Sequence, residues 1–178
     1  MAYDHRPDPG EYNAYYDRYI ALVPTGDIIA LLSVQIDDTL ALVRDLTEEQ
    51  ALHAYAPGKW TIKEVLGHIM DAERIFMYRA LRFARGDATP LPGFDENAYA
   101  PAGGFSARPL ASLIAELTAV RRATVAFLAG MPAEAWQRSG TANESAASVR
   151  ALAWITAGHE LHHRLILAQR YLAAHSVS

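Results

Sequence analysis

The stretch GKWTIKEVLGHIMDAERIFMYRALRFARG, residues 58–86, decides the fold. Its apolar residues recur every three or four positions, which is the period of an amphipathic helix. Thr61 and Glu64 have the spacing of a capping box at the helix start, and Gly86 stands where a glycine commonly ends a helix. We therefore predict one long helix over residues 61–85.

Three further segments carry the same apolar period and predict helices over residues 27–45, 109–128 and 148–173. Residues 25–27 offer a cap for the first of these helices, and Pro109 suits the first turn of the next. Four long helices without a convincing strand predict an all-α four-helix bundle. The length of 178 residues fits a single domain over residues 1–178.

The connection over residues 86–109 is rich in glycine and proline. It is longer than the ~12 to 15 residues beyond which an irregular connection usually has a function or is disordered. We expect an ordered lid that packs on the bundle through Phe94, Tyr99 and Phe105, although a purely structural wrap is an equal alternative. The loop over residues 130–147 is a second candidate for such a cover.

The composition excludes several classes of protein. With 51% hydrophobic residues, 20% charged residues and a net charge of -4, the chain is expected to be soluble and globular, without the basic field that would attract nucleic acid or a membrane surface. No cysteine is present, so a metal would be bound through nitrogen and oxygen. The polar, aromatic residues 1–19 lack the apolar core of a signal peptide, so a cytoplasmic location is expected.

The histidines of two predicted helices suggest a metal site. His159 and His163 are four residues apart, which corresponds to ~40° of rotation and ~6 Å of rise, so both imidazoles leave the same helix face. His68 lies in the apolar stretch of residues 61–85 and is the natural third ligand. Spacing alone leaves a second interpretation open, because neutral imidazoles also occur in protein cores as hydrogen-bonded residues.

The string of residues 159–163 also fits the H-E-x-x-H pattern of zinc peptidases, in which the glutamate acts as general base. A metzincin would place its third histidine at the position of Gln169, so this interpretation is disfavoured. Glu160 points about 100° away from His159 around the helix axis. It is expected either to hydrogen-bond to a ligand residue from outside the metal site or to be solvated. His162 is expected at the helix surface or in a dimer contact.

Two carboxylates flank His68 on its own helix. Glu64 precedes it and Asp71 follows it by one turn on the same side, so both are candidates for taking or relaying a proton. The alternative is that they orient His68 or pair with arginines. Trp60 is expected to pin the preceding loop to the bundle.

Four arginines give the same predicted helix a basic face: Arg74, Arg79, Arg82 and Arg85. Such a face is usually solvated or ion-paired. Binding the carboxylates of a thiol cofactor is a second possibility.

Residues 55–99, followed by GHELHHRLILAQRYL at residues 158–172, resemble the DinB-like (DinB/YfiT-type) metalloprotein superfamily. The resemblance covers the chain from about Tyr15 to Leu172, and Trp60 is among its distinctive features. It implies an up-down-down-up four-helix bundle, commonly a homodimer. It also implies three histidine ligands, which match His68, His159 and His163.

The same resemblance implies a function only in outline. Three imidazoles leave coordination positions open, which suits catalysis by zinc or nickel better than by calcium or magnesium. Members of this family include S-transferases and isomerases that use a low-molecular-weight thiol. A thiol S-transferase acting on a small-molecule substrate is therefore the first hypothesis, a metal-dependent hydrolase using activated water the second, and a non-catalytic metal-binding stress protein the third.

Overall fold

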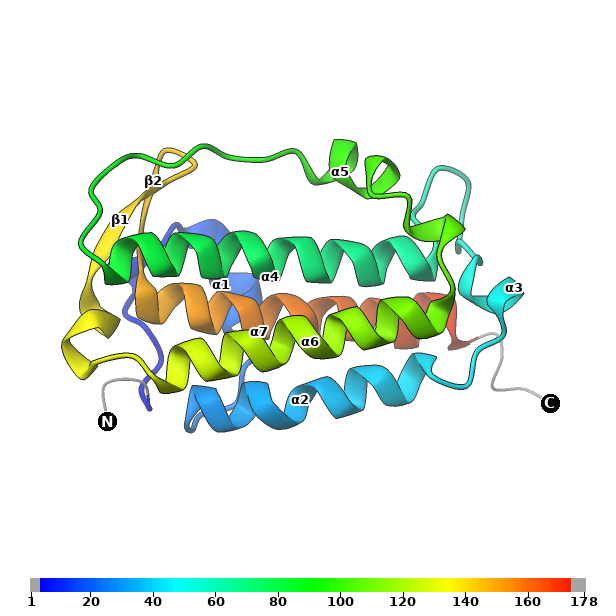
Figure 1. Ribbon diagram of the computed structural model, residues 1–178, viewed down its shortest axis with the longest axis horizontal. Coiled ribbons are helices and arrows are strands. Elements are labelled where there is room, and N and C mark those ends of the chain that lie inside the picture. The colour runs from blue at the N-terminus through cyan, green and yellow to red at the C-terminus, as the bar shows by residue number, and fades with distance from the viewer. Residues whose placement is uncertain (1–3, 174–178) are drawn as a thin grey trace.

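Four long helices form the body of the computed structural model, which describes residues 4–173 (Figure 1). These helices are α2 (Ile28–Val43), α4 (Ile62–Ala84), α6 (Leu110–Ala129) and α7 (Val149–Ile166). In Figure 1, α2 and α7 run in one direction and α4 and α6 in the other. The predicted all-α, up-down-down-up bundle is therefore confirmed, and the four helices begin and end close to the predicted positions.

The helix ends follow the signals in the sequence. The Thr61 side chain accepts a hydrogen bond from the Glu64 backbone N–H, while the Glu64 side chain accepts one from the Thr61 N–H. The side chains of Asp27 and Ser148 cap α2 and α7 by accepting hydrogen bonds from backbone N–H groups of the first turn, without the reciprocal bond. Gly86 has a φ of +76°, which glycine adopts without strain, and it follows the end of α4.

Shorter elements join the long helices. Helix α7 continues as a π-helical stretch over Leu167–Tyr171. The remaining α-helices are α1 (Asp17–Ile20), α3 (Glu48–Ala51) and α5 (Glu96–Ala102). Single 3₁₀ turns occupy Pro9–Glu11, Ala14–Tyr16, Phe105–Ala107 and Ala133–Gln137.

The prediction that the chain has no strand was wrong at one point. Strands β1 (Ser139–Ala142) and β2 (Ser145–Ser148) form an antiparallel hairpin at one end of the bundle (Figure 1). Both turn residues, Asn143 and Glu144, have positive φ, as in the tight turns that join such strands. The hairpin escaped prediction because its strands consist mainly of serine, alanine and glycine, which have low strand propensity.

The bundle core has an apolar cluster at each end and a polar layer between them. Trp136 and Trp154 lie fully buried in one cluster, whereas Leu66 and Leu113 belong to the other. Gln35 of α2, Arg121 of α6 and His163 of α7 fall between members of the two clusters, whereas Lys63 and Arg79 of α4 each lie within the stretch of one cluster. The middle of the bundle is therefore the place where chemistry-bearing side chains gather.

None of the helices within residues 4–173 combines the length and apolar character that crossing a lipid bilayer requires.

Candidate metal centre

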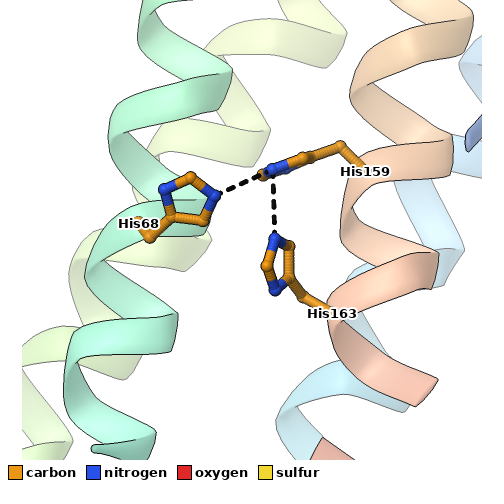
Figure 2. Close-up of side chains that lie close together, drawn as sticks. All are labelled: His68, His159 and His163. Atoms are coloured by element: carbon orange, nitrogen blue, oxygen red, sulfur yellow. Dashed lines mark hydrogen bonds between the residues drawn. The ribbon is translucent and has the colours of Figure 1, made fainter. Parts of the chain in front are cut away.

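The three predicted histidine ligands lie together in the middle of the bundle. Helix α4 supplies His68, and α7 supplies His159 and His163 from one face (Figure 2). The Nε2 atom of His159 lies 2.9 Å from Nε2 of His68 and 3.2 Å from Nε2 of His163. One ring nitrogen from each residue lies within 4.8 Å of the other two. His159 and His163, which are four residues apart, therefore present their imidazoles on the same face of α7, as the sequence predicts.

Burial keeps these imidazoles neutral. The side chains of His68, His159 and His163 are 8%, 6% and 9% exposed. Burial lowers the pKa of His68 to about 4 and that of His163 to about 3, and it lowers the pKa of His159 well below its ordinary value. A neutral imidazole has a free lone pair on one ring nitrogen, so three potential ligand atoms face one point.

The chemistry of this donor set fits a divalent transition metal. Imidazole nitrogens that bind one zinc ion at ~2.0–2.1 Å lie on the order of 3 Å apart, which agrees with the two Nε2 separations. Nitrogen ligands suit zinc or nickel, whereas calcium and magnesium prefer oxygen. Three ligands also leave coordination positions for a further molecule.

Gly67 precedes His68 on α4, and Gly158 precedes His159 on α7. Each glycine allows another segment of the chain to pack closely against its helix. A Cβ atom on Gly67 would overlap the ring of Phe105, and one on Gly158 would overlap the backbone carbonyl of Tyr19. The Tyr19 ring stands edge-on to His159, with 5.5 Å between the ring centroids. These close contacts fix the connection and the N-terminal segment against the two helices that carry the imidazoles.

Trp60 contacts the site directly as well as pinning its loop. Its ring lies 4.8 Å from that of His68, measured between centroids. Its backbone carbonyl accepts a hydrogen bond of 2.7 Å from the Tyr171 hydroxyl, which joins the loop to the end of the last helix. Trp60 thus holds its loop against the bundle, as expected, and its ring also stands beside His68.

A cavity of about 400 Å³ opens beside His68 and His159. Its walls come from the N-terminal segment, α4, the connection after α4, the hairpin and α7. Side chains that line it include Tyr16, Tyr19, Phe76, Arg79, Phe94, Glu96 and Asn143. This volume is in the range of sites for small organic molecules.

A second cavity, of about 230 Å³, lies beside His163. Trp60, Tyr171 and Asn97 are among its lining residues. Glu96 lines the first cavity and Asn97 the second, so the start of α5 stands between the two. The connection over residues 86–109 thus covers the histidines. Phe105 is buried and anchors it, whereas Tyr99 is exposed and its ring packs on that of Phe94.

Glu96 is a candidate that sequence reasoning missed. Its negative charge partly opposes the effect of burial on the pKa of His68, which places the carboxylate within electrostatic reach of the imidazole. The Asp95 side chain caps α5 by accepting hydrogen bonds from the N–H groups of Asn97 and Ala98. The Asp-Glu-Asn run inside the connection was the available signal, but only the folded connection shows which cavity each residue lines.

Neither carboxylate proposed from the sequence lines these two cavities. Glu64 is engaged in the capping box with Thr61, and Asp71 lies 3.6 Å from Arg74. Burial raises the pKa of Asp71, an effect that the charge of Arg74 opposes. A role for Glu64 or Asp71 in proton transfer stays a prediction.

Glu160 is neither solvated nor directed toward the cluster of imidazoles. It is fully buried and accepts hydrogen bonds of 2.6 Å each from Arg121, Gln35 and Thr39. Arg121 also donates two hydrogen bonds of 2.9 Å to Glu73. The H-E-x-x-H glutamate is therefore part of the ion-pair network in the bundle core, not a base beside the histidines.

The four arginines predicted on the helix over residues 61–85 differ in their surroundings, and Arg85 follows the end of α4. Arg74 pairs with Glu116 at 2.6 Å and Arg82 pairs with Asp87. Arg85 is exposed, whereas Arg79 is only 4% exposed and lines the larger cavity.

The fold and the three imidazoles define a helical-bundle protein with a candidate metal centre. The family model described as the DinB superfamily matches residues 31–167, and the chain belongs to this superfamily. The predicted family is therefore confirmed.

Two individual proteins are similar to this chain, one over a third of its length and the other over nearly all of it. OB0413 of Oceanobacillus iheyensis, named as a candidate metal-dependent hydrolase, is 34% identical over 59 residues, which are 33% of this chain and 34% of that protein. The chain thus matches about a third of the length of this curated relative. YfiT from Bacillus subtilis, described as a probable metal-dependent hydrolase with an unusual four-helix bundle topology, has a TM-score of 0.70 and 15% identity. The likeness covers 98% of this chain and 95% of YfiT, and it shows a common fold.

Proposed function

We propose that this protein is a metal-dependent enzyme acting on small molecules, in which His68, His159 and His163 hold one divalent ion, zinc or nickel. The observation that carries the proposal is the meeting of three buried, neutral imidazoles beside a cavity of about 400 Å³. When bound there, the ion would supply a Lewis acid that makes water or a thiol nucleophilic near neutral pH.

The residues around the centre would have separate tasks. Tyr19 and Trp60 hold the imidazole rings in place through edge-on and tilted ring contacts. Aromatic side chains of the larger cavity would position the substrate and exclude water. Glu96 faces this cavity and would accept a proton from the nucleophile and return it to the leaving group.

Hydrolysis is the reaction that the two similar proteins support, because both are described as metal-dependent hydrolases. In this reaction water is the nucleophile, so the larger cavity alone has to accommodate an organic substrate.

Thiol transfer is the second candidate, and the smaller cavity favours it. A transferase must bind a low-molecular-weight thiol and an electrophile on the same centre. The cavity of about 230 Å³ beside His163 offers room for one of them while the larger cavity holds the other.

Metal analysis of protein purified without a metal-affinity tag tests the centre. We expect about one zinc or nickel ion per chain, loss of the metal in His159→Ala and His163→Ala, and retention in His162→Ala. The last variant is a matched control because His162 neighbours the cluster on the same helix without belonging to it. Folded wild-type protein that takes up no metal would refute the proposal.

Two screens then separate the reactions. Metal-dependent cleavage of an ester or amide without added thiol would establish hydrolysis. Consumption of one specific thiol together with an electrophile would establish transfer. A metal-loaded protein inactive in both screens would favour the non-catalytic alternative.

The proposal extends to the setting of the enzyme. We infer that the protein is cytoplasmic and forms a homodimer. We also infer that it acts on a small molecule and binds neither nucleic acid nor a membrane. The weakly acidic composition supports the exclusion of nucleic acid. Light scattering of the purified protein tests the dimer.

A further inference from the structure

The end of the larger cavity away from the histidines contains a buried cation. Arg79 lines the cavity and is 4% exposed. Its Nη2 donates a hydrogen bond of 2.8 Å to the Pro92 carbonyl, and Tyr16 lies close enough for its hydroxyl to affect the pKa of Arg79. Among residues 4–173, no carboxylate pairs with Arg79, in contrast to Arg74 and Arg82 on the same helix.

A guanidinium group in this position has unused binding capacity. It has five N–H donors in a planar fork, and the Pro92 carbonyl that accepts from one of them is neutral. Burying a charge without a counter-ion is unfavourable, and burial accordingly lowers the pKa of Arg79. An oxyanion that enters the cavity would accept two parallel hydrogen bonds from the fork and balance the charge.

The position of Arg79 sets the shape of such a ligand. Arg79 follows His68 by eleven residues, which corresponds to ~20° of net rotation and ~16 Å of rise, so both leave the same face of α4. Phe76 lies between them on the cavity wall, and Tyr16 and Phe94 also line the cavity. A ligand that reaches from one end to the other needs an elongated body with apolar or aromatic character.

A second charge in the cavity limits the charge of the ligand. Glu96 lines the same cavity, and its charge acts on His68 at the opposite end from Arg79. Both charges affect the pKa of the Tyr16 hydroxyl. Burial raises this pKa, the charge of Arg79 opposes the increase, and the charge of Glu96 adds to it. Because one cation and one anion line the cavity, a monoanionic carboxylate that pairs with Arg79 leaves only one net negative charge, whereas a phosphate monoester would leave close to two.

We propose that the larger cavity binds organic carboxylates, with the carboxylate on Arg79, an apolar body along the aromatic wall and the reacting bond beside His68 and His159. The reaction rests on the proposed function, but the binding of the carboxylate does not, because Arg79 is not a metal ligand. The carboxylate end of the substrate therefore determines which molecules the centre can act on.

Binding measurements on metal-free protein test this proposal. The probes are phenylacetate, 3-phenylpropionate and 4-phenylbutyrate, each compared with its neutral amide, and phenylethyl phosphate. By titration calorimetry we expect one of the acids to bind about tenfold or more tightly than its amide, since hydrogen bonds to a charged group are worth that factor. In Arg79→Gln the preference should fall to within about twofold, and Arg79→Lys should keep part of it.

Arg85→Gln is the matched control, because it removes the same charge at the exposed residue that ends the same helix and should keep the preference. Unchanged thermal unfolding of Arg79→Gln would show that the variant is folded. The proposal is overturned if Arg79→Gln keeps the wild-type preference, if no acid is preferred over its amide, or if the phosphate binds more tightly than every carboxylate. An intact preference in a protein that takes up no metal would refute the proposed function and leave the carboxylate site standing.

Discussion

At the scale of single residues, the clearest contrast is between carboxylates that face the site and carboxylates that hold the fold. Glu96 lines the larger cavity, whereas Glu160 is enclosed by Arg121, Gln35 and Thr39. Two residues of the same type thus have different surroundings, and the H-E-x-x-H motif alone would have selected the one that faces no cavity.

Glu96→Gln should lower kcat by about 100-fold or more, because a positioned general base contributes ~10²–10⁴-fold and the amide cannot accept the proton. The metal content should not change, since Glu96 is not one of the three clustered ligands. Steady-state kinetics on the substrate found in the screens measure the effect. Glu134→Gln, at an exposed position, is the control, and equal activity of both variants would exclude Glu96 as the base.

Acid should destabilise the metal-free protein through its histidines. Burial lowers the pKa of His68 to about 4 and that of His163 to about 3 from the ordinary value of 6.5. Between these values the unfolded chain binds more protons than the folded one, so the free energy of unfolding decreases as the pH falls below about 6.5. The slope is up to about 1.4 kcal/mol per pH unit for each imidazole.

Urea unfolding at several pH values between about 4.5 and 7 measures this slope. His163→Ala removes one of the buried imidazoles and should give a shallower dependence on pH. The same slope in the variant and the wild type would show that His163 does not contribute.

At the scale of elements, the buried network around Arg121 couples all four long helices. Arg121 of α6 bonds to Glu73 of α4 and to Glu160 of α7, and it also donates to the Leu32 carbonyl of α2. Arg121→Ala leaves two buried carboxylates without a counter-ion and should cost about 3–5 kcal/mol. Chemical denaturation measures the loss, and Arg122→Ala, an exposed neighbour, should stay within ~0.5 kcal/mol of the wild type.

The contact between Gly67 and Phe105 should control how firmly the connection covers the site. In Gly67→Ala the new methyl group would overlap the Phe105 ring, so the ring must leave its place. We expect a loss of about 1–3 kcal/mol and faster hydrogen exchange in residues 86–109. Gly10→Ala meets no neighbouring atom and is the control, and unchanged exchange in Gly67→Ala would refute the anchoring role of Phe105.

At the scale of the whole molecule, zinc binding should stabilise the fold. A ligand that binds only the folded state at a free concentration 100 times its Kd adds about 2.7 kcal/mol. The Tm should therefore rise when zinc is added to chelator-treated protein and should not rise with magnesium. His159→Ala should show no zinc-dependent change, and an equal rise in that variant would place the bound metal elsewhere.

The main features of the molecule followed from local patterns. The period of the apolar residues and the capping box at Thr61 predicted the helices, because these signals act within one or two turns. His159 and His163 share a face for the same reason. Glu96 and Arg79 could not be assigned to a cavity in advance, because their surroundings depend on how a long irregular connection folds back onto the bundle.

The direction of the helices has a consequence for the length of the chain between them. Because α4 and α6 run the same way, the connection must return the full length of α4, which is ~34 Å for residues 62–84. Fully extended, roughly ten residues would cover that distance, yet residues 85–109 are used. The surplus is folded into α5, whose first residues line the cavities beside the histidines, and into the turn at Phe105, which packs on Gly67. Insertions and deletions in residues 85–109 can reshape the larger cavity while the bundle keeps its geometry, so the shape of that cavity can diverge independently of the three clustered histidines.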